Sequence, residues 1–93
     1  MIKGSTKSGF EFEISKDILQ DAEFLEPMYA IQEGDGSQLY KLINVMLGKD
    51  QKKRLWAHIK KVTGKSRVMQ PDVEVEIADM FNAITEDAEA KNS

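Results

Sequence analysis

The stretch Phe10-Glu11-Phe12-Glu13-Ile14 alternates large apolar residues with glutamates. Successive side chains of a β-strand point to opposite faces, so this pattern predicts a strand with one apolar and one acidic face. Residues 2–6 can pair with it across Lys7-Ser8-Gly9, which predicts a β-hairpin over residues 1–14. An isolated two-stranded hairpin is not stable in water. The remainder of the chain must therefore supply helices that cover the apolar face.

The segment after the hairpin predicts a helix from Ser15 to about Glu33. Ser15 suits an N-cap, because its hydroxyl can accept a hydrogen bond from an unpaired amide of the first turn. Asp17 complements the positive end of the helix dipole. Pro27 removes an amide donor and crowds the preceding turn, so we expect a kink or break near residues 23–26.

This first helix carries two apolar stripes on different faces. One stripe consists of Ile18, Ala22, Leu25 and Tyr29, and the other consists of Phe24, Met28 and Ile31. A small hairpin cannot cover both stripes, which leaves two interpretations. The second stripe either completes the core or forms an exposed surface that binds another subunit or an amphipathic partner segment.

Three further helices are predicted downstream. Ser37 follows the turn Glu33-Gly34-Asp35-Gly36 and caps a helix that Gly48 ends. The next helix covers Lys49–Thr63, and another begins around Pro71, a residue suited to a first turn. The expected core residues of these helices are Leu39, Leu42, Ile43, Met46, Leu47, Leu55, Trp56, Ile59, Val62, Val73, Ile77, Met80, Phe81, Ile84 and Ala88.

These elements define the expected architecture. The fold class is α+β, mostly α, with a small N-terminal β-hairpin packed on about four helices. The 93 residues are expected to form a single domain, with the hairpin in residues 1–14, helices in residues 15–90 and a frayed tail in residues 91–93. Such a short chain has a modest core, so its stability is expected to be marginal or shared with neighbouring subunits.

Composition and motifs argue against several classes of protein. The chain has no cysteine, no apolar run long enough to span a bilayer and no secretory leader pattern. Its one histidine, His58, lies between cations at the edge of an apolar stripe, where we expect a solvated residue rather than a general base. We therefore expect no catalytic residues, no metal site and no cofactor.

The net charge of −3 conceals three blocks of charge. Residues 1–48 carry net −4, residues 49–67 carry net +7 and residues 68–93 carry net −6. The basic block can attract the acidic blocks within or between molecules, and it can dock an acidic partner through Lys52, Lys53, Arg54, Lys60 and Lys61. The alternative is a small nucleic-acid-binding regulator that uses the helix Lys49–Thr63. Lysine dominates the block and Trp56 shares the apolar stripe, so nucleic acid is the less favoured partner.

Four segments taken in order resemble the short form of the tail assembly chaperones of long-tailed bacteriophages (siphophages). They are the Trp-bearing basic segment Leu55–Lys61, the loop Gly64-Lys65-Ser66-Arg67-Val68, the acidic helix through Glu76–Phe81, and the tail Ala88–Ser93. The resemblance implies a non-catalytic factor of virion morphogenesis that binds the tape measure protein and helps recruit tail tube subunits. It also implies activity in the cytoplasm of a bacterial host and absence from the mature virion. Self-association is a separate expectation, which follows from the modest core and from the second apolar stripe of the first helix.

The tripeptide Ala90-Lys91-Asn92 leads to an expectation about the messenger RNA that encodes the chain. Its codons can spell a run of seven A-rich bases on which ribosomes slip back by one. The resemblance implies a longer form made by such a programmed frameshift near the end of the short form. A frayed tail would accommodate that extension without disturbing the core.

Overall fold

The computed structural model describes the backbone of residues 1–92 and the side chains through Glu86. Over these residues the chain is an α+β fold, mostly helical, with an N-terminal antiparallel hairpin, as predicted. The hairpin consists of β1 (Ile2–Ser5) and β2 (Glu11–Ile14). The helices are α1 (Ala22–Gln32), α2 (Leu39–Thr63) and α3 (Gln70–Asn92), with short 3-10 turns at η1 (Ile18–Gln20) and η2 (Gly36–Gln38). No helix within the described part is long and apolar enough to cross a membrane.

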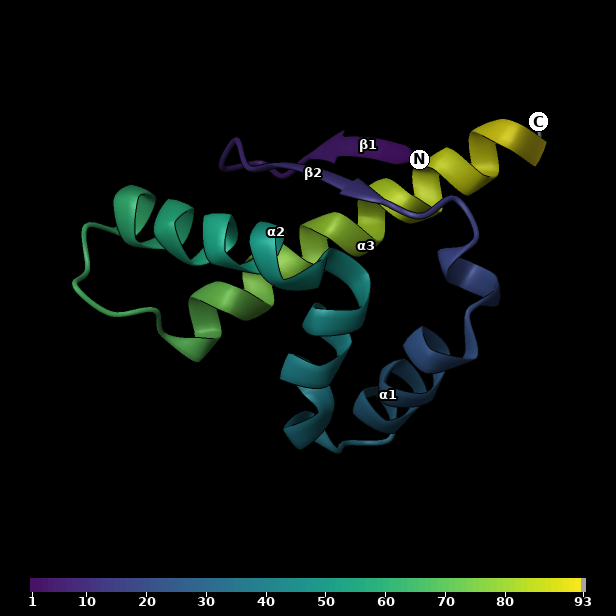
Figure 1. Ribbon diagram of the computed structural model, residues 1–93, viewed down its shortest axis with the longest axis horizontal. Coiled ribbons are helices and arrows are strands. Elements are labelled where there is room, and N and C mark those ends of the chain that lie inside the picture. The colour runs from purple at the N-terminus through teal and green to yellow at the C-terminus, as the bar shows by residue number, and fades with distance from the viewer. Residues whose placement is uncertain (93) are drawn as a thin grey trace.

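The hairpin lies across the second half of α2 and beside α3 (Figure 1). Gly4 pairs with Phe12, and a Cβ at Gly4 would lie only 2.7 Å from the tip of the Phe12 ring. The ring therefore occupies space that only glycine leaves free. Phe10, Phe12 and Ile14 are all buried, which confirms the predicted apolar face. Burying this face against helices stabilises a hairpin that could not persist alone.

The region after the hairpin differs from the prediction. Ser15 does not cap a long helix; its hydroxyl accepts the amide of Asp17, and only the short turn η1 follows. The N-cap of α1 is Asp21, whose carboxylate accepts the Glu23 amide at 2.9 Å. The chain breaks at Asp21, earlier than expected, because its extended backbone ends the first turn and its side chain starts the next helix. Pro27 then lies buried inside α1, where it has no N–H to donate to the carbonyl of the preceding turn.

The inward face of α1 also differs from the expected stripe. Tyr29 is 54% exposed and Ala22 is exposed, although both were expected in the core. Phe24 is fully buried instead, with its ring edge-on to Phe81 of α3 at a centroid distance of 6.1 Å. The Phe24 ring buries more apolar surface than Ala22 would, and it packs against the Phe81 ring of α3. Helix α1 therefore turns the face that carries Phe24 toward the core.

Helix α2 contains two of the predicted helices, divided at Gly48. This residue has φ 76° and ψ 173°, a conformation that other residues rarely adopt, and the helix bends sharply there (Figure 1). The first segment packs on α1 and the second packs on β2. Ser37 is not the predicted cap, because it lies within η2 and the Asp35 carboxylate accepts its amide. Gly64, in the left-handed conformation, ends α2, and its backbone N–H donates a hydrogen bond to the Lys60 carbonyl.

Helix α3 begins near Pro71, as predicted, and buries Val73, Ile77, Met80 and Ile84. Its backbone continues through Asn92, so two residues of the expected frayed tail are helical. Ser93 lies outside the described residues, and so does the side chain of Ala88.

We predict that Gly48→Ala lowers the free energy of unfolding by about 1–3 kcal/mol, because alanine is strained at this backbone conformation. Urea unfolding followed by circular dichroism measures the change. Gly36→Ala is the matched control, since Gly36 lacks a positive φ and has open space around it. Equal stability of the two variants would contradict the role assigned to the bend.

Candidate partner-binding surfaces

An apolar groove runs between α1 and α3 over the first segment of α2. It consists of two adjoining hollows of about 300 Å³ and 220 Å³ that share Ile31, Leu42 and Phe81. Leu42 is fully buried and forms part of the floor. The remaining lining residues are Leu19, Phe24, Met28, Gln32 and Gly36, followed by Leu39, Gln70, Glu74, Ile77, Ala78, Ile84 and Thr85. The concave shape and apolar lining are typical of a surface that receives an apolar partner segment.

The three residues predicted to bind a partner all line this groove. Phe24 is fully buried and is therefore a core residue, whereas Met28 and Ile31 are partly exposed. Each of the two interpretations of this stripe thus holds for part of it, since one residue belongs to the core and the other two are accessible. Phe24 supports the floor, and Met28 and Ile31 present accessible apolar atoms above it.

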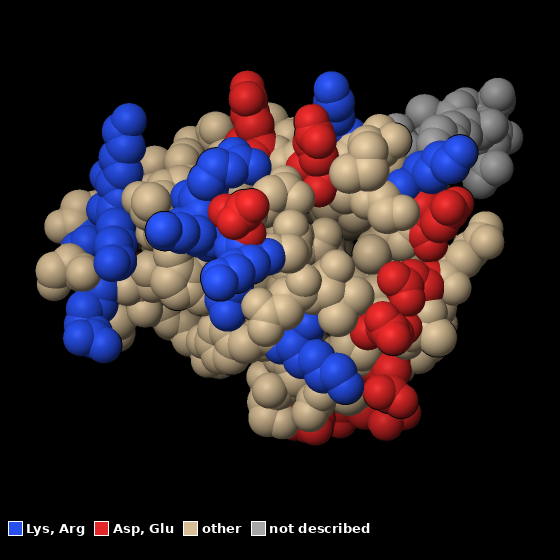
Figure 2. All heavy atoms as spheres, viewed as in Figure 1, with Lys and Arg blue, Asp and Glu red and all other residues tan. Residues whose placement is uncertain are grey.

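The predicted basic dock lies on the second segment of α2. Lysine and arginine side chains gather on this side of the molecule, whereas acidic side chains follow the side formed by α1 (Figure 2). Lys53, Arg54, Lys60 and Lys61 are exposed. Within the described part of the chain, none of the dock's cations forms an ion pair. The dock can therefore present its charge to an acidic partner.

Trp56 does not have the predicted fully buried position. Leu55 and Ile59 are buried as expected, but Trp56 is partly exposed and Val62 is 49% exposed. The indole lies 6.3 Å from the Tyr40 ring, and the Lys52 ammonium lies 5.4 Å from its centroid. The reason is geometric, because the two buried residues already fill the side of α2 that faces the core. Trp56 remains at the boundary, where the Lys52 cation is attracted to its ring.

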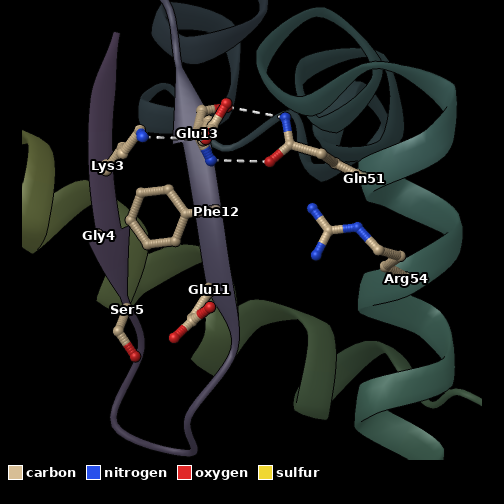
Figure 3. A pocket seen from close by; sticks show the side chains of 8 residues that line it. All are labelled: Lys3, Gly4, Ser5, Glu11, Phe12, Glu13, Gln51 and Arg54. Atoms are coloured by element: carbon tan, nitrogen blue, oxygen red, sulfur yellow. Dashed lines mark hydrogen bonds and ion pairs between the residues drawn. The ribbon is translucent and has the colours of Figure 1, made fainter.

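A hollow of about 710 Å³ lies between the hairpin and α2 (Figure 3). Gln51 bridges the two elements, because its amide accepts from the Glu13 backbone N–H at 2.8 Å and donates to the Glu13 carbonyl at 2.7 Å. It also donates to the Leu47 carbonyl at the bend of α2. The side chain thus satisfies the edge of β2 as a neighbouring strand would. Sequence reasoning missed this residue, since a glutamine in a basic helix gives no signal of its partner.

Polar side chains from the hairpin loop, α2 and α3 form a network at the loop end of the hairpin. Thr6 and Ser8 both donate to one oxygen of Glu76, each at 2.8 Å, and Ser8 lies 2.8 Å from Nε2 of His58. Which atom donates between Ser8 and His58 depends on the tautomer of the imidazole. The network joins the hairpin loop to α2 and α3.

No group of three or more histidine, cysteine or acidic side chains that could hold a metal ion occurs within the described residues. Comparisons of the chain with models of protein families, with curated proteins and with solved structures found no match.

We predict that Glu76→Ala lowers the free energy of unfolding by about 1–3 kcal/mol, because it leaves the buried Thr6 hydroxyl without its acceptor. Chemical denaturation of the purified protein measures the loss. Glu74→Ala is the control, since Glu74 is exposed two residues away on the same helix. A loss no larger than that of the control would show that the network contributes nothing to stability.

Proposed function

We propose that this protein is a tail assembly chaperone of a long-tailed bacteriophage and binds the tape measure protein. The observation that carries the proposal is the apolar groove between α1 and α3, in which Met28, Ile31 and Phe81 are accessible. A long helical protein exposes apolar stripes until the tail tube surrounds it, and such stripes aggregate. A groove that covers one such stripe at a time would keep the tape measure protein soluble.

Other parts of the proposed role follow from the resemblance. The chaperone would act without catalysis in the cytoplasm of the bacterial host, help recruit tail tube subunits and be absent from the mature virion. The basic dock Lys52, Lys53, Arg54, Lys60 and Lys61 offers a second surface for an acidic tube subunit or another copy of the chain. A longer form made by frameshifting at Ala90-Lys91-Asn92 would add a second binding module to the same scaffold.

We predict that Met28→Asp reduces the amount of soluble tape measure protein obtained on co-expression with this chain. A carboxylate in the groove must lose water when an apolar segment binds, which weakens the complex. Tyr29→Asp is the matched control, because Tyr29 is adjacent in sequence but does not line the groove. The test measures the tape measure protein in the soluble fraction, together with the thermal stability of each variant.

The proposal would be wrong if wild-type protein left the tape measure protein insoluble. It would also be wrong if Met28→Asp and Tyr29→Asp, both folded, supported solubility equally. Phe24→Asp is unsuitable for this test, because a charge at that fully buried position would unfold the domain.

A nucleic-acid-binding regulator is the second candidate, and the position of Trp56 favours it. The indole is partly exposed beside Tyr40 and within the basic segment, and aromatic rings among cations are the usual elements of a single-strand binding surface. The Lys52 ammonium lies over the Trp56 ring, however, and competes with a base for it.

We predict that any binding of DNA by the basic dock is weak, independent of sequence and steeply reduced by salt, since lysines supply only phosphate contacts. Filter binding or anisotropy over a salt series measures it, with Lys60→Glu as the variant and Lys7→Glu on the hairpin as the control of equal charge change. Tight binding to one sequence at physiological salt, undisturbed by scrambled competitor, would place the regulator ahead of the chaperone.

A further inference from the structure

The apolar groove lies in the acidic part of the molecule. The segment that forms α1 contains Glu23 and Glu26 and no basic residue, and residues 70–86 of α3 contain five acidic residues and no basic one. Glu74 is the one charged residue among those that line the two hollows, and it is exposed at the rim. Any segment that binds in the groove thus meets an apolar floor, the Glu74 carboxylate at the rim and two flanking helices that carry acidic residues.

We propose that the groove binds a basic amphipathic helix, with apolar residues on the face that enters it and lysine or arginine beside that face. The inference rests on the proposed function in one respect, which is that it takes such a helix to be a segment of the tape measure protein. It goes further by assigning the chemistry that the bound segments must share. The acidic surroundings of the apolar groove are the observation that selects this partner, because a basic helix would complement their charge.

The geometry sets the length of the occupant. The hollow near the end of α1 at Ile31 is lined by the start of α3, including Gln70 and Glu74, and the hollow near Leu19 is lined by Ile84. The two helices therefore run antiparallel and form the two walls of the groove. The eleven residues of α1 rise about 16 Å, so a helix of about three turns fills the groove. Its apolar positions would recur at every third or fourth residue.

The walls leave room for side chains of different shapes. Ala78 and Gly36 are small and exposed at the rim, whereas Met28 is partly exposed and can change rotamer to fit its neighbour. Such a surface recognises an apolar pattern rather than one fixed sequence. A long helical partner could consequently be held at several places along its length.

The acidic side chains of α1 do not all remain free to contact the occupant. Glu26 already lies 3.6 Å from the Lys41 ammonium, on the side where α1 packs on α2. Glu74 has only a long hydrogen bond of 3.4 Å from Gln70 and is the best placed to meet a cation. This makes Glu74 the residue on which selection for a basic helix can be tested.

The test measures binding of two labelled model helices by fluorescence anisotropy, each about 15 residues long so that it can form a helix. Both peptides carry leucine at every third or fourth position, and the flanking positions are lysine in one peptide and glutamate in the other. At a physiological ionic strength of about 0.15 M the full chain is expected to bind the lysine peptide about tenfold more tightly. Met28→Asp is expected to weaken the binding of the lysine peptide, because that residue lies in the apolar part of the groove.

Two variants of equal charge change locate the effect. Glu74→Lys is expected to weaken binding of the lysine peptide about fivefold, whereas Glu11→Lys, on the exposed outer face of the hairpin, is expected to change it by less than about twofold. Equal effects of the two variants would show attraction by net charge alone and overturn the proposal. Equal or tighter binding of the glutamate peptide, or binding of neither peptide, would overturn it as well.

The outcome also separates this inference from the proposed function. If wild-type protein solubilises the tape measure protein in a Met28-dependent manner and the model helices show no charge preference, the chaperone function stands and the inference falls. If the lysine peptide binds with the expected dependence on Glu74 and the tape measure protein stays insoluble, the surface stands and the proposed function falls.

Discussion

The sharp bend at Gly48 is the constraint on which the rest of the structure depends. A straight helix over Leu39–Thr63 would reach either α1 or the hairpin, but not both. The positive φ of Gly48 turns the helix so that its first segment packs on α1 and its second segment packs on β2. The chain thereby builds one continuous core from the buried side chains of Phe12, Leu42 and Leu55. A domain of this size needs that continuity, because two separate cores would each be too small to be stable.

The bend also separates the two candidate surfaces. The first segment of α2 supplies the floor of the apolar groove through Leu39 and Leu42, and the second segment carries the basic dock. The apolar groove and the basic dock are therefore built on different segments of α2, and basic and acidic side chains gather on different sides of the domain (Figure 2). Surfaces with such different chemistry can bind different partners without competing, which suits a protein proposed to bring tail components together.

The hairpin is held by polar contacts as well as by its apolar face. Gln51 forms hydrogen bonds with the edge of β2, and Glu76 accepts hydrogen bonds from two hydroxyl groups of the loop that joins the strands. Within the described residues, no buried polar side-chain atom lacks a hydrogen-bond partner. These contacts fix the direction from which the strands approach the helices, whereas burial of Phe10 and Phe12 supplies the larger part of the stability.

The sequence by itself determined the elements whose signals are local. Alternation of apolar and acidic residues specified the hairpin, Gly48 and Gly64 specified the ends of helical segments, and the apolar spacing of α3 specified its buried face. It also showed the charge blocks and the stripe of Phe24, Met28 and Ile31 that lines the groove. These features depend on backbone conformation and periodicity, which a short stretch of chain carries within itself.

Only the tertiary structure decided which residue caps a helix and which apolar side chains are buried, where the local sequence allowed more than one arrangement. Asp21 replaced Ser15 as the cap, Phe24 became a core residue while Met28 and Ile31 stayed accessible, and Trp56 stayed at the boundary. The positions of the two aromatic residues depended on partners distant in sequence, namely Phe81 for Phe24 and Tyr40 for Trp56. The physical reason is that the free energy a side chain gains from burial or hydrogen bonding depends on the residue that lies opposite it. The identity of the opposing residue is set by how the helices pack, and no single segment contains that information.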